Sequence, residues 1–177
     1  MSSFAKDVNK LLIAIKKGDK SAFKALYNLI ANHVRGVARY YLVDKTYSED
    51  VVVETFQKIY LYINSYKEGK DGYNWICKTT QNIAINYNTK FLANVSTETI
   101  TNHGTDEYEK NSEEKIDLFR AIDRLHPENR EIIYKYYFLD KTMQEIAIEH
   151  HLSKSGVKKR IDKILKQLKV FIESGKR

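Results

Sequence analysis

The sequence predicts an all-α protein of two small helical domains, and three observations support the prediction. Apolar residues recur mostly at spacings of three and four, the period of an amphipathic helix. The 177 residues include only seven glycines and one proline, so few positions interrupt helices. An acidic strip, VSTETITNHGTDEYEKNSEE at 95–114, separates two basic blocks and has few large apolar residues. Because such a strip cannot bury enough surface to fold alone, we expect domains at 1–90 and 113–177 joined by a flexible acidic linker at 91–112.

The first domain is expected to contain four helices: Phe4–Lys17, Ser21–Leu42, Ser48–Ser65 and Trp75 to about Lys90. Thr46 and Glu49 have the spacing of a capping box that opens the third helix. Its inward residues are predicted to be Val52, Thr55, Phe56, Ile59, Tyr60 and Ile63. A polar, glycine-containing loop, Tyr66–Tyr73, leads into the fourth helix. The second domain is expected to begin with two helices, Glu113–Leu125 and Glu128–Phe138, and Pro127 suits the first turn of the latter.

The C-terminal stretch reads as two helices with a tight turn between them. Thr142 and Glu145 form a second candidate capping box, which opens a short helix. The segment 150–152 makes the turn, and Ser153 is a natural N-cap for a longer helix. The apolar stripe of that helix is continuous at the helical period and consists of Val157, Ile161, Ile164, Leu165, Leu168, Phe171 and Ile172.

The outer face of this last helix is basic. It carries Ser155, Lys159, Lys163 and Lys166, with Lys158 and Arg160 towards the flanks. From His150 to the end, nine Lys and Arg outnumber two acidic residues, Asp162 and Glu173, a balance of +7 that equals the net charge of the whole chain. A short helix, a turn and a second helix with an outward basic row is the helix-turn-helix pattern, which places a helix in the major groove of DNA. The pattern favours DNA binding over a plainly solvated lysine face.

The remaining composition narrows the class of protein. A single cysteine, Cys77, excludes an intramolecular disulfide framework, fits a reducing cytoplasm and is interpreted as a buried thiol. There is no signal-peptide pattern and no membrane-spanning apolar run, so we expect a cytoplasmic protein without membrane insertion. No phosphate-binding glycine loop, HExxH or CxxC motif occurs, and the adjacent His150 and His151 cannot face one metal on a helix. We therefore expect no enzyme, no catalytic residue, no metal and no cofactor.

Four stretches in order resemble the sigma-70 family of RNA polymerase initiation factors, in the compact extracytoplasmic-function (ECF) layout with region 2 and region 4 domains. They are GDKSAFKALY (Gly18–Tyr27), SEDVVVETFQKIY (Ser48–Tyr60), WICKTTQNIAINY (Trp75–Tyr87) and the C-terminal pair LHPENREIIYKYYFLDKTMQEIA (Leu125–Ala147) and LSKSGVKKRIDKILKQL (Leu152–Leu168). The resemblance implies an opening helix pair, a polymerase-docking helix, a promoter-melting helix and a domain that reads the minus-thirty-five element. It also implies a monomer when free, with core RNA polymerase, promoter DNA and an anti-sigma factor as partners.

The resemblance assigns roles to three sets of residues. The core polymerase would be bound by Glu49, Asp50, Glu54 and Gln57. The minus-ten element would be bound by Tyr66, Lys67, Lys70, Tyr73, Trp75, Lys78, Asn82, Asn86 and Lys90. The minus-thirty-five element would be bound by Lys154, Ser155, Lys158, Lys159, Arg160 and Lys163.

Within these sets, chemistry suggests finer roles. Lysines mainly bind phosphates, so Arg160 and Ser155 are expected to be the base readers of the C-terminal domain. Asparagine is a bidentate partner for adenine, which suits an A·T-rich melted strand. For Tyr66 and Tyr73, stacking on flipped bases and an amphipathic place at the edge of the core are both open.

The sequence departs from the family pattern at several positions. Val53 stands where glutamine is common and Asn86 where aspartate is usual, and the basic pair that normally follows becomes Asn88-Thr89-Lys90. His150-His151 replaces the Leu-Gly of the turn, and histidine tolerates a left-handed conformation better than most residues. Two other classes remain alternatives. One is a helix-turn-helix regulator that binds duplex DNA without polymerase, and the other is an adaptor whose acidic third helix binds a protein while its basic tail is only solvated.

Overall fold

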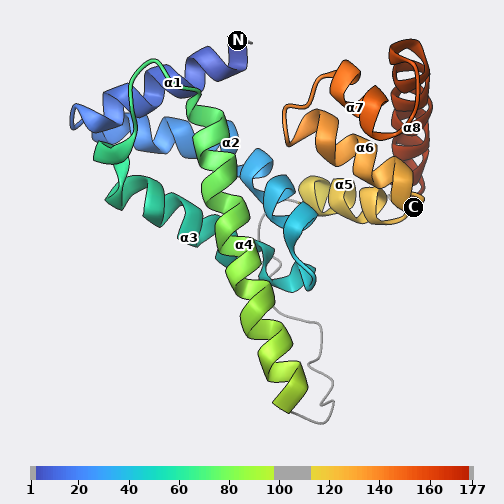
Figure 1. The fold of residues 1–177 in the computed structure, drawn as a ribbon, viewed down its shortest axis with the longest axis horizontal. Coiled ribbons are helices and arrows are strands. Elements are labelled where there is room, and N and C mark those ends of the chain that lie inside the picture. Colours follow the sequence, from blue (N-terminus) through green and yellow to red (C-terminus); the bar gives the residue numbers. More distant parts are fainter. Residues whose placement is uncertain (1–2, 98–112, 176–177) are drawn as a thin grey trace. The chain divides into compact units, whose positions relative to one another are not determined.

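The computed structural model describes residues 3–97 and 113–175. The chain divides into two compact units, residues 1–100 and 101–177, which we describe separately as the N-terminal unit and the C-terminal unit. Every regular element within the described ranges is a helix, which confirms the all-α prediction (Figure 1). Residues 98–112, most of the predicted linker, lie outside the described ranges.

The N-terminal unit contains the helices α1 (Ser3–Lys16), α2 (Lys20–Tyr41), α3 (Ser48–Leu61) and α4 (Gly72–Thr97), with 3-10 turns at Lys45–Tyr47 and Ile63–Ser65. Their apolar stripes meet in one core that includes Leu12, Leu26, Ile30, Val52, Ile59 and Ile76, all essentially inaccessible to solvent. A side chain at Gly72 would collide with Leu12, and the Gly72 amide donates to Asn9 Oδ1 over 2.8 Å. The glycine therefore lets the start of α4 approach α1 closely.

The start of α3 differs from the prediction. Thr46 does not form a capping box with Glu49. Instead Asp44 accepts hydrogen bonds from the Thr46 amide at 2.9 Å and from its hydroxyl at 2.7 Å, which caps the preceding 3-10 turn. The Glu49 carboxylate is taken by the Arg35 guanidinium of α2 through two hydrogen bonds. The Asp44 carboxylate thus takes the hydrogen bonds of Thr46, and the cationic Arg35 takes the Glu49 carboxylate. The predicted capping box therefore does not form.

The ends of two helices are also corrected. The third helix was expected to reach Ser65 but stops at Leu61, before the 3-10 turn. Tyr60, predicted to face inward, is 63% exposed. The fourth helix was expected to stop near Lys90 but continues to Thr97, so the first seven residues of the predicted linker are helical. Figure 1 shows these last turns of α4 extending past the neighbouring helices of its unit.

The C-terminal unit contains the helices α5 (Glu113–Asp123), α6 (Pro127–Tyr137), α7 (Met143–Glu149) and α8 (Lys154–Gly175). Its buried residues include Ile122, Ile132, Ile146, Val157, Ile161 and Ile164. Pro127 occupies the first turn of α6, as predicted. The predicted stripe of α8 is buried or half-buried except for Leu165, which is 40% exposed. The stripe is therefore narrower than the sequence suggested.

The turn between α7 and α8 is held by local hydrogen bonds. Thr142 and Glu145 form the predicted capping box at the start of α7. At its end the Leu152 amide donates to the Ala147 carbonyl over 2.8 Å, and His151 adopts a left-handed conformation with φ +53°. The Ser153 hydroxyl accepts from the Gly156 amide at 3.0 Å, as an N-cap of α8 should. The helix-turn-helix arrangement predicted from the sequence is present.

Candidate functional site

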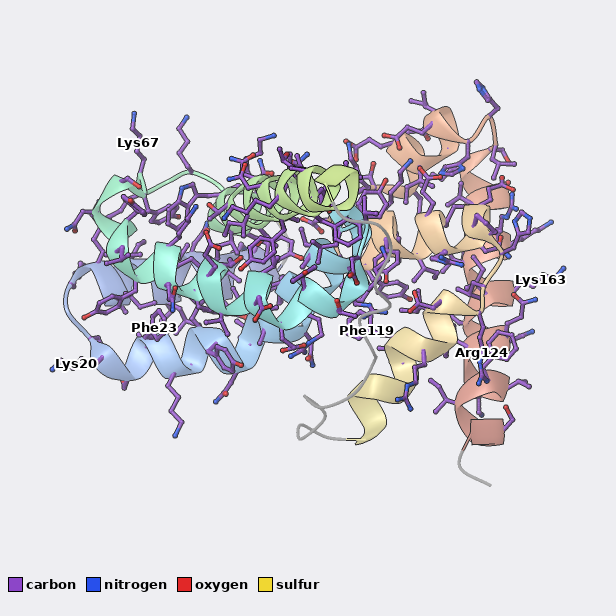
Figure 2. All side chains as sticks on the ribbon, turned by 90° about the horizontal axis from the view of Figure 1, so that it is seen from below. Lys20, Phe23, Lys67, Phe119, Arg124 and Lys163 are labelled. Carbon is purple, nitrogen blue, oxygen red and sulfur yellow. The ribbon has the colours of Figure 1, made fainter. Side chains whose placement is uncertain are left out.

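The basic residues of α8 form an outward face, as the helical period predicted. The side chains of Lys154, Ser155, Lys158, Lys159 and Lys163 are all exposed. Figure 2 shows Lys163 pointing away from the helices of its unit. Because Val157, Ile161, Ile164 and Leu168 on the opposite side of α8 are buried, this basic face is the part of the helix that a duplex can approach. We call these five residues the α8 face.

Arg160, expected to read bases, is engaged elsewhere. Its guanidinium donates to both carboxylate oxygens of Glu128, over 2.8 and 2.6 Å, and its Nε donates to Asn129 Oδ1 over 2.9 Å. This forked arrangement joins α8 to the first turn of α6, and it holds the pKa of Glu128 below its ordinary value. Three of the five N–H donors of Arg160 are thus taken by α6, so in this conformation the side chain positions the helix.

A second ionic network joins α6 to the short helix α7. The Lys135 ammonium lies 2.6 Å from carboxylate oxygens of both Glu131 and Glu149, and only 12% of its side chain is exposed. Lys141 adds longer contacts to Glu145 and Glu149, at 3.9 and 3.7 Å. The hydrogen bond from Lys135 lowers the pKa of Glu149. The spacing of Glu131 and Lys135 by four residues was a sequence signal for part of this network, but the contact to Glu149 required the fold.

Four of the α4 side chains predicted to bind the minus-ten element lie in one exposed row. Lys78, Asn82, Asn86 and Lys90 follow one another at intervals of four residues and are all exposed. Lys78 Nζ donates to Gln81 Oε1 over 3.1 Å, and Lys90 Nζ lies 5.8 Å from the centre of the Tyr87 ring. The row therefore presents two amides and two ammonium groups along one side of the helix.

The loop before α4 presents lysines but hides its tyrosines. Lys67 and Lys70 are exposed, and Lys67 points into solvent in Figure 2. Tyr66 and Tyr73 are only 2% and 3% exposed. The Tyr66 hydroxyl donates to the Lys70 carbonyl over 2.9 Å, and burial raises the pKa of that hydroxyl. Of the two interpretations left open by the sequence, the structure therefore favours a place in the core, and in this conformation neither ring is available to stack on a base.

Trp75 takes an intermediate position. It is half-buried, and the centre of its ring system lies 5.6 Å from that of Tyr66. Part of the indole thus helps to close the core, while the rest stays at the surface beside the exposed loop. Cys77, predicted to be buried, is half-buried against the same core.

The outer side of α3 combines acidic and apolar residues. Asp50, Glu54 and Gln57 line an open hollow of about 440 Å³, together with Val53, Lys58, Leu61, Tyr62 and Tyr87. A neighbouring, nearly apolar hollow of about 360 Å³ is lined by Phe23, Tyr27, Val53, Phe56, Gln57 and Tyr60. Val53 and Gln57 belong to both, so the hollows are continuous. We call the residues of the two hollows the α3 surface.

Apolar exposure is the feature of the α3 surface that sequence reasoning missed. Val53, Tyr60, Leu61 and Tyr62 are 55%, 63%, 70% and 59% exposed. A contiguous apolar patch of this kind on a soluble domain marks an interaction site. Glu49, predicted to act with Asp50 and Glu54, is instead paired with Arg35 of α2. The signal available in the sequence was the position of Val53 between acidic residues on the polar side of the helix.

The charges on the α3 surface are only partly balanced. Glu54 lies 3.3 Å from Lys58 on the next turn. Burial and the nearby carboxylates of Glu54 and Asp50 raise the pKa of Tyr87, whose ring lies beside them. The surface therefore offers apolar contact area with a negative edge. Such a combination suits a partner that brings apolar and basic side chains.

Neither a metal site nor a membrane-spanning helix is found within the described ranges. No group of three or more His, Cys, Asp and Glu side chains there is arranged to hold a metal ion. None of the helices described is both long and apolar enough to cross a membrane.

In comparison with known proteins, the C-terminal unit matches a family model. A family model described as Sigma-70, region 4 matches residues 115–168, which include α6, α7 and most of α8. The ECF RNA polymerase sigma-E factor of Haemophilus influenzae is 35% identical over 77 residues. The aligned segment covers 44% of this chain and 40% of the relative, so the match spans less than half of that protein.

Solved structures give weaker likenesses. CnrH, in complex with the cytosolic domain of CnrY, is 17% identical with a TM-score of 0.47, over 95% of this chain and 98% of that one. The sigma factor RpoE of Bartonella quintana, in complex with the anti-sigma factor NepR, is 17% identical with a TM-score of 0.44, over 85% and 96%.

Proposed function

We propose that this chain is an ECF-type sigma factor of the sigma-70 family, which binds core RNA polymerase and directs it to promoters. The observation that carries the proposal is the coincidence of the region 4 match, residues 115–168, with a helix-turn-helix whose second helix exposes a lysine face. A helix of this kind, anchored by its apolar side, can enter a major groove and neutralise phosphates.

The C-terminal unit is proposed to bind the upstream, minus-thirty-five element as duplex DNA. The α8 face supplies the ammonium groups that position the helix on the phosphates. The forked contact between Arg160 and Glu128 keeps α8 at a fixed angle to α6. Arg160 is thus a positioning residue, and Lys154, Ser155, Lys158, Lys159 and Lys163 are proposed to meet the DNA.

The N-terminal unit is proposed to bind the melted minus-ten element along α4. Lys78, Asn82, Asn86 and Lys90 present amides and ammonium groups at intervals of one turn, which can contact successive nucleotides of a single strand. Lys67, Lys70 and the exposed part of Trp75 border the start of this row. Asparagine can pair with the edge of adenine through two hydrogen bonds, whereas the buried Tyr66 and Tyr73 are excluded from this surface.

The α3 surface is proposed to dock on core RNA polymerase. Asp50, Glu54 and Gln57, predicted for this role, lie together on it, and the exposed apolar side chains around Val53 add contact area that loses water on binding. An anti-sigma factor, the other proposed partner, would compete for the same surface. Competition between the two partners for one surface is a measurable consequence of this arrangement.

The test is run-off transcription with bacterial core RNA polymerase from the source organism, with and without the chain, on the DNA upstream of its own gene. A transcript that starts at one site only in the presence of the chain is the expected result. Asp50→Ala should weaken binding to core polymerase, and Lys159→Ala should weaken binding to the promoter. If no transcript forms but the chain alone shifts the DNA tightly, the chain is a direct duplex-binding regulator and the proposal is wrong.

A further inference from the structure

Asp162 lies on the outermost ridge of the basic helix, among its lysines. With 3.6 residues per turn, Ser155, Lys159, Asp162 and Lys166 fall on one ridge of α8, and all four are exposed. The buried residues Val157, Ile161, Ile164 and Leu168 fall on the opposite side. Asp162 therefore sits on the part of α8 that reaches furthest from the core, between lysines.

The other side chains of this ridge cannot discriminate well between bases. Lysine carries a point charge with rotatable donors and is a weaker reader of base edges than a planar, bidentate group. The planar group on this part of α8, the guanidinium of Arg160, is held by Glu128 and Asn129. The Ser155 hydroxyl lies 3.0 Å from that of Ser153. Of these four residues, Asp162 is thus the strongest hydrogen-bond acceptor that can be presented to a base.

The carboxylate of Asp162 also makes no direct polar contact with the residues that the structure describes. Its spacing of four residues from Lys158 and Lys166 would allow ion pairs along the helix. Yet among the residues that the structure describes, no ion pair or hydrogen bond of Asp162 is formed. Burial, Tyr136 and the charge of Asp162 together raise the pKa of Tyr137 on α6, an influence through space that leaves the carboxylate oxygens unoccupied. The surrounding ammonium groups reduce the repulsion between this carboxylate and the phosphates, which makes its approach to a duplex feasible.

We propose that Asp162 is a specificity-determining residue of the C-terminal unit, and that its carboxylate accepts a hydrogen bond from the N4 amino group of a cytosine in the major groove. Cytosine is the base whose major-groove edge offers a donor without an adjacent acceptor on the same base. The inference rests on the proposed binding of duplex DNA by α8. It adds the residue that would select a base there, since the lysines of the α8 face serve mainly to position the helix.

The control residue is Glu173, on the same ridge and also exposed. Eleven residues separate it from Asp162, about 16 Å along the helix. Asp162→Ala and Glu173→Ala change the net charge equally, so both should raise affinity for DNA in general by a similar small factor. Only a residue in contact with a base should change the preference among bases.

The experiment is selection from duplexes randomised across the upstream element. It is run with the full chain bound to core RNA polymerase and, in parallel, with the full chain alone at low salt. The wild-type chain should enrich cytosine at one position by about fivefold or more over the other bases. Asp162→Ala should remove that preference, and Asp162→Asn, which brings a donor and an acceptor, should shift it towards adenine. Glu173→Ala should leave it unchanged.

The outcomes separate the two proposals. If the wild-type chain selects a sequence in both formats but Asp162→Ala selects the same one, the role of Asp162 is wrong while promoter binding stands. The role of Asp162 is equally wrong if the wild-type chain shows no cytosine preference. If the wild-type chain selects a DNA sequence only in the absence of polymerase, the sigma-factor proposal fails. The Asp162 variants, tested on the chain alone, then still show whether Asp162 sets the base preference.

Discussion

The α3 surface and the α8 face are both outer sides of amphipathic helices, yet they differ in chemistry. Four of the five residues of the α8 face are lysines, so the face carries one sign of charge. The α3 surface keeps Val53, Leu61 and Tyr62 more than half exposed beside Asp50 and Glu54. A helix that meets nucleic acid needs counter-charge for phosphates, whereas a helix that meets another protein gains more from apolar area that leaves water. The contrast indicates two different classes of partner in one chain.

The largest effect should come from reversing charge on the α8 face. Lys159→Glu with Lys163→Glu should lower the affinity of the chain for promoter duplex by about 100-fold at low salt, because two phosphate contacts are lost and the slope of log affinity against log salt falls by about two. Fluorescence anisotropy across a salt series measures both quantities. Lys20→Glu with Lys24→Glu, an equal change on α2, is the control. An equal loss in both double variants would show that only net charge matters.

The next largest effect is expected from a substitution on the α3 surface that leaves the fold intact. Val53→Asp should weaken binding of the chain to core polymerase at least about tenfold, as expected for a residue near the centre of an interface. Leu92→Asp on α4 is the matched control, since both side chains are 55% exposed. Biolayer interferometry gives the two affinities. Equal binding by both variants would remove the α3 surface from the interface.

Removal of the cap on α7 tests how much the capping box contributes to the stability of the C-terminal unit. Thr142→Ala loses the hydroxyl that accepts from the Glu145 amide at 3.2 Å, which should lower the free energy of unfolding of the C-terminal unit by about 1 kcal/mol. Thr142→Ser keeps the hydroxyl and should cost much less. Urea denaturation followed by circular dichroism measures the difference. A cost as large in the serine variant would point to lost methyl packing instead of a lost cap.

A smaller effect is expected from neutralising the α3 surface without touching its apolar part. Asp50→Asn should weaken binding to core polymerase about threefold at low salt, and the difference from wild type should vanish at high salt, because exposed charges are screened. The Val53→Asp effect should persist, since water exclusion depends little on salt. Titrations at two salt concentrations compare the variants. Persistence of the Asp50→Asn effect at high salt would contradict this division of roles.

The last prediction concerns acid stability of the contact that positions α8. Hydrogen bonds from Arg160 lower the pKa of Glu128 from its ordinary value of 4.5. A carboxyl whose pKa is lower in the folded state contributes stability above its unfolded pKa and loses it as pH falls through the folded pKa. Glu128→Gln should therefore flatten the fall in unfolding free energy below about pH 4.5. Urea titrations at several pH values test this, and an unchanged slope would contradict it.

Two similar sequence patterns had different outcomes, and the reason is physical. Thr142 with Glu145 forms its capping box, because both groups lie within one turn and the nearby Lys141 approaches the other oxygen of the Glu145 carboxylate, at 3.9 Å. Thr46 with Glu49 has the same spacing, yet Asp44 takes the threonine and Arg35 takes the glutamate. A local pattern predicts a local hydrogen bond only when no better partner is brought in by the chain or the fold.

The positions of the tyrosines also could not be predicted from local sequence patterns. Composition and alternation could not decide whether Tyr66 and Tyr73 face bases or the core, since a tyrosine suits both. Tyr66 is buried beside Trp75 of α4, and Tyr73, itself on α4, is buried against Phe4 of α1 and His33 of α2. Tyr60, predicted to point inward at the edge of its stripe, is left at the surface because α3 turns that edge towards solvent. Residues at the border of a helical stripe are placed by the neighbouring helices, which the period alone does not describe.

The sequence by itself determined the helical class, the positions of most helices, the capped helix-turn-helix and the basic sign of its outer face. These depend on hydrogen bonds and spacings within about four residues. Only the tertiary structure decided that Arg160 positions α8, that Glu49 is withdrawn from the α3 surface and that apolar side chains remain exposed there. The first two outcomes depend on pairs that are 32 and 14 residues apart in the sequence. Such pairs meet only after helices pack, so no local pattern in the sequence contains them.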